Sequence, residues 1–452
     1  MDGRTAGSRN RTWCSAIFTV GWILILFNIL PAAAQGVAPP ETPAGHALAS
    51  WLEAFNSADE TRMKAYTEKY QPTVPVGLKM SFRQQTGGLD LTGIRISEPL
   101  HIEFSTKERT SDTVAIGKFF LSGSDPPRIT GFALLAIPPG DPPVLGFSID
   151  AQTRDRVIDH AIAQLQDSYV SADLAKQMGE ALRRHQKHGD YNAITEGDEF
   201  ANLLATHLRD VSHDKHITVR FVPTRLPDNL DTPPDAQQLA RNQRLMQRSN
   251  CAFDKVEVLP NNIGYVKFNA FISPADCSQT AIAAMGFIAN SDALIFDLRE
   301  NGGGDPAMIA LICSYLFDRP THLNDLWNRK ENFATQWWTL PYVPGKRLPN
   351  IPVYVLTSPR TFSGAEEFSY DLQNLKRATI VGEVTGGGAH PVRGQRIDDR
   401  FIIGVPFAKA VNPVTKTNWE GTGVKPDVAV AASDALATAQ KLASEKLSST
   451  AK

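Results

Sequence analysis

The spacing of hydrophobic residues changes along the chain and divides it into regions. Over residues 45–56 and around residues 61–70, apolar positions recur every three or four residues, which predicts two amphipathic helices. Between residues 91 and 137 apolar and polar residues alternate in short segments, as in antiparallel strands with one exposed face. The pattern therefore predicts a small α+β domain over residues 40–150.

The next region is strongly helical. Helical spacing over residues 151–222 predicts a subdomain with three helices, at 156–169, 173–188 and 195–208. Alternation of Ile217, Val219 and Phe221 then predicts a strand. Proline and glutamine are frequent in residues 223–255, so we expect this segment to be a connector or a lid.

Beyond residue 256, short apolar strands alternate with helices. The predicted strands are separated by helical segments and lie at 263–268, 293–297, 353–356 and 379–381. Such alternation predicts a largely parallel sheet over residues 256–435, with ligands bound at the carboxyl ends of its strands. Residues 436–452 are left as a C-terminal tail.

The first 34 residues have the pattern of a secretory signal peptide. Three arginines precede an apolar run, and Ala32–Ala34 supplies a cleavage site of small residues. A retained membrane anchor is the alternative. Cleavage leaves 43 basic and 47 acidic residues, a net charge of −4, which favours neither nucleic acid nor an anionic membrane as partner. We expect a secreted or periplasmic protein without membrane contact after cleavage.

Three cysteines remain after cleavage, in a compartment that permits disulfides. Cys251 and Cys277 flank a predicted strand, whereas Cys313 lies in an apolar helix. We predict a Cys251–Cys277 disulfide with Cys313 buried and reduced. Three free thiols are the alternative.

Ser363 is the strongest candidate for chemistry. It follows the apolar run 352–356 and Pro359, and a helical pattern begins at Gly364. A serine at a strand-to-helix junction has an exposed hydroxyl and free backbone N–H groups beside it, which acyl transfer requires. A plain helix N-cap is the alternative.

Three further segments carry candidate site residues. Gly302–Gly304 follow a predicted strand, and they suit an oxyanion better than a phosphate because the G-K-[ST] ending of a phosphate loop is missing. His216 stands at a loop-to-strand junction and Glu420 lies between an aromatic residue and a glycine, although solvated side chains are the alternative for both. A zinc site at His213 and His216 lacks further ligands at suitable spacing, so no metal is predicted.

Four motifs occur in a characteristic order: D-L-R-E-N-G-G-G from Asp297, T-S-P-R-T-F-S-G-A-E-E-F from Thr357, G-E-V-T-G-G from Gly382 and E-G-T-G-V-K-P-D-V from Glu420. With them, residues 155–430 resemble the C-terminal-processing, or tricorn-core, serine peptidases of family S41. The resemblance implies a ClpP/crotonase-like α/β core. It also implies that Ser363 is the nucleophile, that His216 is the base, that Glu420 is the orienting acid, and that the oxyanion donors are the N–H groups of Gly303, Gly304 and Gly364.

The sequence also distinguishes branches of that family. Gly388 stands where the processing-protease branch has its catalytic lysine, and His216 matches the histidine of the retinoid-binding-protein-like branch. The segment between Phe221 and Asn262 is too short for the PDZ domain of the lysine branch. Lys215 departs from the family pattern, which has a relaying serine there, so Glu420 either contacts His216 directly or has a slight role.

Other histidines and lysines are secondary candidates. His213 is the reserve base, whereas Lys409 and Lys416 lack the family spacing.

The resemblance implies a secreted serine endopeptidase or carboxyl-end-processing peptidase that acts on peptides or proteins without a cofactor. Two alternatives remain: a non-catalytic protein that binds apolar ligands or peptides with the same core, and a non-peptide acyl hydrolase. The order of elements in residues 40–150 resembles an NTF2-like cone, which would bind a small ligand or serve as a packing module.

Overall fold

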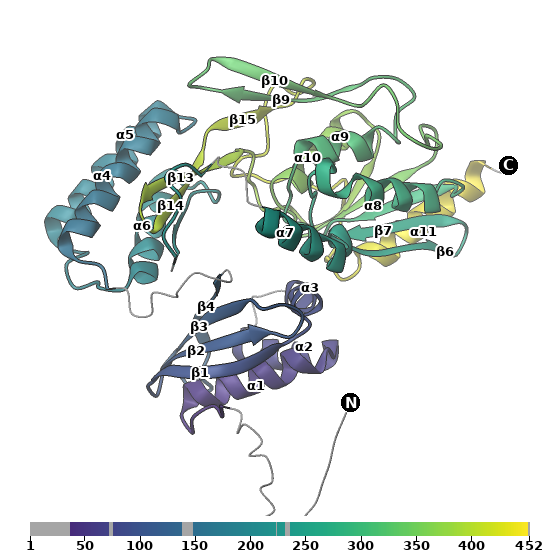
Figure 1. Cartoon of the computed structure of the whole chain (residues 1–452). Coiled ribbons are helices and arrows are strands. Elements are labelled where there is room, and N and C mark those ends of the chain that lie inside the picture. Colours follow the sequence, from purple (N-terminus) through teal and green to yellow (C-terminus); the bar gives the residue numbers. More distant parts are fainter. Residues whose placement is uncertain (1–36, 72–75, 138–147, 223, 231–235, 451–452) are drawn as a thin grey trace, which may run out of the picture.

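The computed structural model describes residues 37–71, 76–137, 148–222, 224–230 and 236–450. The predicted signal peptide and residues 138–147, near the end of the first predicted domain, lie outside the described residues. Within the described part of the chain, no helix has the length and apolar character needed to cross a membrane. The fold is mixed α/β, and three regions can be followed in Figure 1.

The first region, the accessory domain, is an antiparallel sheet covered by helices. Helix α1 (Pro43–Ser57) is capped by Thr42, whose side chain accepts a hydrogen bond from the N–H of Gly45. Trp51 of α1 packs on Phe104 and Phe119 of the sheet. The other elements are α2 (Glu60–Tyr70), α3 (Val76–Thr86) and four strands in sequential order, β1 (Leu89–Ser97), β2 (His101–Glu108), β3 (Val114–Leu121) and β4 (Ile129–Ile137).

The second region, the helical part, combines the three predicted helices with a sheet. The helices are α4 (Ala151–Ser168), α5 (Ala172–His188) and α6 (Gly197–Ser212), and the sheet has the order β13 (Val392–Asp398), β14 (Phe401–Pro406), β5 (Thr218–Phe221). The residues of β13 and β14 fall within the range 256–435 predicted for the α/β core, although no strand was predicted there. In the structure β14 pairs with β5, which gives the backbone of that four-residue strand a partner, and Phe401 and Val405 are buried against the helices.

The third region, the α/β core, has a six-stranded sheet that is largely parallel, as predicted. Its order is β16 (Val428–Ala429), β12 (Thr379–Gly382), β11 (Val353–Thr357), β8 (Ala293–Asp297), β7 (Ile263–Phe268), β6 (Phe253–Leu259), and only β6 pairs antiparallel. One face packs on α8 (Pro274–Phe287), α9 (Pro306–Cys313) and α10 (Gly364–Asn374). Strands β8 and β11 are buried along their whole length, which explains their continuous apolar sequence.

Two segments of this region differ from the prediction. The expected tail forms α11 (Ala435–Thr450), because Ala435, Ala439 and Ala443 repeat at helical spacing and bury a flat face on the sheet. The expected connector contains α7 (Ala236–Arg248) and a short turn, η1 (Asn250–Ala252). Cys251 of this turn forms a disulfide with Cys277 of α8, and Cys313 is free and buried.

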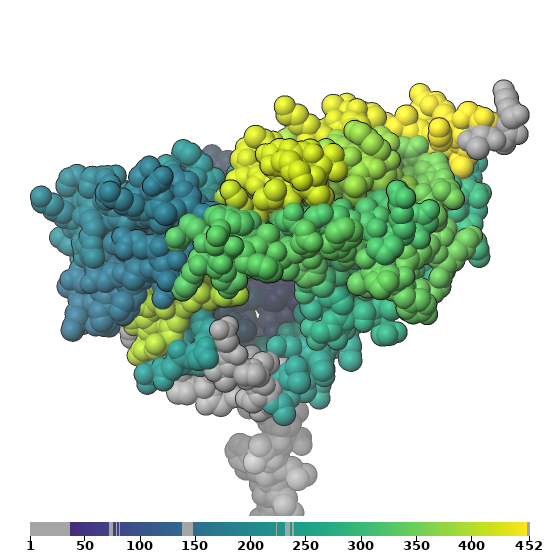
Figure 2. Space-filling model, turned by 90° about the horizontal axis from the view of Figure 1, so that it is seen from above, coloured from purple at the N-terminus to yellow at the C-terminus, as the bar shows by residue number. Residues whose placement is uncertain are grey.

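A narrow sheet spans the space between the helical part and the core. Its order is β10 (Phe333–Trp338), β9 (His322–Asn328), β15 (Ala408–Val411), and none of these strands was predicted. The side chain of Arg329, in the turn between β9 and β10, donates to the backbone oxygen of Tyr169 in the helical part at 2.7 Å. Figure 2 shows an opening beside this sheet, through which residues of the accessory domain are visible.

Candidate active site

Ser363 lies in a strained turn between β11 and α10. Its backbone has φ 54° and ψ −120°, a conformation that a residue with a side chain rarely adopts. Its N–H donates to Glu366 Oε2 at 2.8 Å. A strained strand-to-helix turn of this kind exposes the serine hydroxyl at the carboxyl end of the sheet, as in nucleophile elbows.

Glu366 fixes this turn to a neighbouring loop. Its buried carboxylate also accepts hydrogen bonds from the N–H groups of Gly387, at 2.6 Å, and Gly388, at 2.8 Å. Burial raises the pKa of Glu366 above its ordinary value, although the hydrogen bonds to the carboxylate oppose this effect. The nucleophile turn and the loop 385–388 therefore form one unit.

The glycine loop after β8 lies against the same turn. A Cβ on Gly303 would come within 2.8 Å of the Ser363 Cβ, so only glycine fits there. The N–H of Gly303 already donates to Asn301 Oδ1 at 2.8 Å. Among the described residues, no acceptor is found for the N–H groups of Gly304 and Gly364. Two of the three predicted oxyanion donors are therefore available, and that of Gly303 is engaged.

His216 comes from the loop between α6 and β5. Its ring packs on Phe362, the neighbour of Ser363, with 4.6 Å between ring centroids. Within the described chain, neither buried ring nitrogen has a hydrogen-bond partner. Burial is the main cause that lowers the pKa of His216 to about 4, helped by His390 and opposed by Asp214. The imidazole is therefore neutral near pH 7, the state in which it accepts a proton.

Asp214 is the carboxylate that faces His216. Its Oδ1 accepts the backbone N–H of His216 at 2.9 Å and lies 3.8 Å from His216 Nδ1. Its Oδ2 lies 2.7 Å from His390 Nδ1 and accepts a hydrogen bond from the Tyr169 hydroxyl at 3.2 Å. Although burial alone would raise the pKa of Asp214, its contacts with His390 and His216 hold that pKa below its ordinary value. Asp214 is thus a buried, ionised group.

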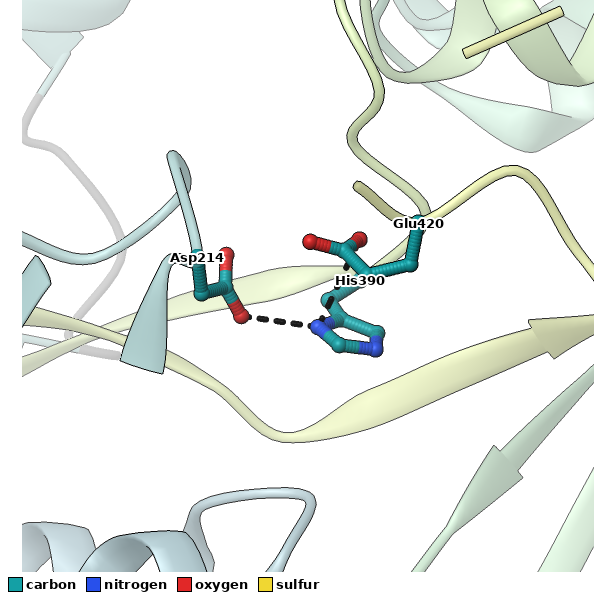
Figure 3. Close-up of side chains that lie close together, drawn as sticks. All are labelled: Asp214, His390 and Glu420. Atoms are coloured by element: carbon teal, nitrogen blue, oxygen red, sulfur yellow. Dashed lines mark hydrogen bonds and ion pairs between the residues drawn. The ribbon is translucent and has the colours of Figure 1, made fainter. Parts of the chain in front are cut away.

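Glu420 approaches the same nitrogen of His390 as Asp214 does (Figure 3). Its Oε2 accepts the N–H of Ala389 at 2.5 Å and lies 3.6 Å from His390 Nδ1. Burial raises the pKa of Glu420 to about 6, while His390 opposes the shift. No contact between Glu420 and His216 is found in the described part of the chain, where the carboxylate that faces the His216 ring is that of Asp214.

Asp214 and His390 were not predicted from the sequence. Asp214 stands two residues before His216, within the segment that identified the base, and His390 ends the glycine-rich segment that begins at Gly386. The signal that the sequence offered was that each residue lies close to a motif that had been identified. The contact between Asp214 and His390 joins positions 176 residues apart, and neither segment alone predicts it.

The secondary candidates lie elsewhere or have other contacts. His213 ends α6 and its N–H donates to the oxygen of Arg209 at 2.8 Å. Lys215 Nζ donates to the backbone oxygen of Gly386 at 2.6 Å. Lys409 covers the ring of Trp327, and Lys416 lies in a turn bonded to Asn412.

Among the described residues, donor atoms spaced closely enough for a metal ion are found at Asp214, His390 and Glu420, and these atoms lie within 4.8 Å of one another.

Solved structures with similar folds include peptidases and one lipoprotein. The photosystem II D1 C-terminal processing protease is 14% identical, with 63% of this chain and 94% of that chain covered and a TM-score of 0.40. The tricorn protease is 14% identical, with 77% of this chain and 40% of that chain covered and a TM-score of 0.39. A lipoprotein from Streptococcus agalactiae is 13% identical, with 67% of this chain and 99% of that chain covered and a TM-score of 0.45.

Family models give the assignment, because the structural similarities are too low to carry it. The model of peptidase family S41 matches residues 262–430. The model of the N-terminal domain of peptidase S41 in eukaryotic IRBP matches residues 151–260. Together the two models cover more than half of the chain. The chain therefore belongs to peptidase family S41, a family of serine-type peptidases.

Proposed function

We propose that this protein is a secreted serine endopeptidase or carboxyl-end-processing peptidase in which Ser363 is the nucleophile and His216 the base. The observation that supports this most directly is the strained Ser363 turn, with a neutral histidine packed on the adjacent Phe362. Peptides or proteins are the substrates that the family indicates.

The first half of the proposed reaction forms an acyl-enzyme. Ser363 Oγ attacks the carbonyl carbon of the scissile peptide bond and gives its proton to a ring nitrogen of His216. The resulting tetrahedral intermediate collapses as its C–N bond breaks, and His216 returns the proton to the leaving amine. Deacylation repeats these steps with water as nucleophile: His216 takes the proton of water and gives it to Ser363 Oγ as the ester bond breaks.

The negative oxygen of the tetrahedral intermediate needs preorganised donors. We assign this role to the N–H groups of Gly304 and Gly364, for which no acceptor is found in the described chain. A Cβ on Gly364 would lie 3.0 Å from the nitrogen of Gly304, so the two residues that carry these groups lie close together. In this proposal Gly303 shapes the loop, because its N–H is held by Asn301. Loss of one such donor costs about a hundredfold in rate.

The surrounding regions have proposed roles as well. We propose a ClpP/crotonase-like core, supported by its parallel sheet, and an NTF2-like accessory domain, supported by three helices packed on a four-stranded antiparallel sheet. Lys118 of this domain forms ion pairs with Glu196 and Asp198 at the start of α6, the helix that leads to His216. Secretion or a periplasmic location is proposed from the N-terminal sequence pattern, and the Cys251–Cys277 disulfide suits it.

Fluorophosphonate labelling tests the proposed activity without knowledge of the substrate. The mature chain is expected to be labelled at Ser363, whereas Ser363→Ala and His216→Ala are not labelled at a measurable rate. Ser369→Ala is the matched control, because Ser369 is a buried serine of the same helix whose hydroxyl donates to the oxygen of Ala365. A folded wild-type chain that remains unlabelled would overturn the proposal and favour a non-catalytic binding protein.

The substrate end is tested separately. Peptides of one sequence with a free or an amidated C-terminus are compared, with product masses as the measurement. Cleavage of only the free form favours carboxyl-end processing, and equal cleavage of both favours an endopeptidase. A chain that hydrolyses esters but neither peptide is a non-peptide acyl hydrolase.

A further inference from the structure

Four titratable side chains form a continuous series that ends at the base. Glu420, His390, Asp214 and His216 follow one another, with distances of 3.6, 2.7 and 3.8 Å between their nearest interacting atoms. They come from three separate segments of the chain. Two carboxylates thus alternate with two imidazoles in a largely buried place, where charges interact strongly.

Asp214 divides its two oxygens between the two histidines. Oδ1 is turned to the His216 backbone and ring, and Oδ2 is turned to His390. A carboxylate 1% exposed needs hydrogen bonds to remain ionised and to keep one orientation. The Nδ1–H of His390 supplies the shorter of the two side-chain hydrogen bonds that reach Oδ2, the other coming from Tyr169.

Glu420 is separated from the base by this arrangement. Its Oε2 is fixed by the N–H of Ala389, the residue before His390, and its nearest side-chain partner is His390 Nδ1. Glu420 has no contact with the His216 ring among the described residues, and the groups between them are His390 and Asp214. Glu420 and Asp214 approach the same ring nitrogen of His390, at 3.6 and 2.7 Å, so Glu420 favours the tautomer that carries a hydrogen on Nδ1.

We propose that His390 is a positioning residue of the peptidase: it holds Asp214 toward His216 and connects Glu420 to the base. The inference rests on the proposed Ser363–His216 chemistry and adds a second histidine to it. Asp214, rather than Glu420, is then the carboxylate that orients the base.

The test measures the second-order rate of fluorophosphonate labelling in purified full-length mature protein, together with kcat and KM for a cleaved peptide. His390→Ala is expected to label about a hundredfold more slowly, the cost of a misplaced catalytic group, with KM little changed. His390→Asn is expected to recover most of the rate, because its amide N–H occupies the place of Nδ1–H. A role in shape alone would leave Asn as slow as Ala, and that result overturns the proposal.

A double-mutant cycle tests the connection to Glu420. If Glu420 acts through His390, Glu420→Gln slows labelling in the wild type but changes the rate by less than about twofold in the His390→Ala background. Equal effects of Glu420→Gln in both backgrounds would show an independent path and overturn the connection. Far-ultraviolet circular dichroism and thermal melting establish that each variant is folded.

Two controls distinguish a positioning role of His390 from a general effect of losing a histidine and from metal binding. His185→Ala removes a histidine–aspartate pair at the end of α5, outside the site, and is expected to label like the wild type. Dialysis against a chelator is expected to leave the rate unchanged, and a loss restored by a divalent cation would make the Asp214, His390 and Glu420 cluster a metal site instead. If the wild type itself does not label, the proposed activity fails; if the wild type and His390→Ala label at the same rate, the positioning role alone fails.

Discussion

The α/β core holds Ser363 through its backbone, whereas the helical part holds His216 through packing. Ser363 lies in a turn fixed by Glu366, and the donors beside it are backbone groups of two adjoining loops. His216 packs on Phe362 and, within the described residues, its ring forms no hydrogen bond. The first half of the site is fixed by backbone hydrogen bonds to Glu366, and the second depends on how two regions of the molecule meet.

This difference suggests where the site is sensitive. Backbone donors do not reorient when a side chain nearby changes, so they are preorganised for an oxyanion. An imidazole held by one ring contact and one distant carboxylate has more freedom, and 3.8 Å between His216 Nδ1 and Asp214 Oδ1 is longer than a hydrogen bond. We infer that bound substrate closes this gap, because catalytic hydrogen bonds often tighten only in the complex.

The largest effect on the histidine half is expected from Asp214→Asn. Loss of the charge facing His216 removes the orientation and stabilisation of its imidazolium, and the rate of acylation should fall by about 10⁴-fold. Labelling rates and burst kinetics measure it. Asp210→Asn, an exposed substitution near the end of α6, the helix that precedes Asp214, is the control. A larger loss for Glu420→Gln than for Asp214→Asn would return the role of orienting acid to Glu420.

The half of the site around Ser363 could be predicted from the sequence, whereas the contacts around His216 could not. The nucleophile turn and the glycine loop were predicted because each is a short segment in which an apolar strand meets glycine or a helix. Asp214 and His390 were missed because their relation arises only when β14 pairs with both β13 and β5. A four-residue strand does not specify its partner, so neither that sheet nor the contact it brings about was predictable.

An intermediate effect is expected from Gly388→Ala, which acts where the two halves touch. A Cβ at residue 388 would lie 2.5 Å from His216 Cε1 and 2.3 Å from Phe362 Cζ, so the imidazole must move. A displacement of about 1 Å in a catalytic group costs about a hundredfold in rate. Labelling should slow accordingly while the protein stays folded. Gly286→Ala on α8 is the control, since nothing lies within 4 Å of its added Cβ. A Gly388→Ala variant with wild-type rate would mean that the position of His216 is not critical.

The smallest expected effect is the response to mild acid. With the pKa of His216 lowered to about 4, chiefly by burial, the base stays neutral well below the ordinary histidine value of 6.5. Acylation should therefore retain most of its rate at pH 5, where about nine-tenths of a group with that pKa is unprotonated. Asp214 and His390 face this ring, and Glu420, with a pKa of about 6, adds a shallow step that should vanish in Glu420→Gln.

Stability must be separated from catalysis in that experiment. Between about pH 4 and pH 6.5, the unfolded state binds a proton at His216 that the folded state does not, so this group lowers the free energy of unfolding as the pH falls. Initial rates are therefore compared only where circular dichroism shows a folded chain. A rate that falls tenfold for each pH unit below 6.5 in folded protein would mean that the base titrates as an exposed histidine. The ring would then leave its packed position on Phe362 in solution, and the helical half of the site would be looser than the structure shows.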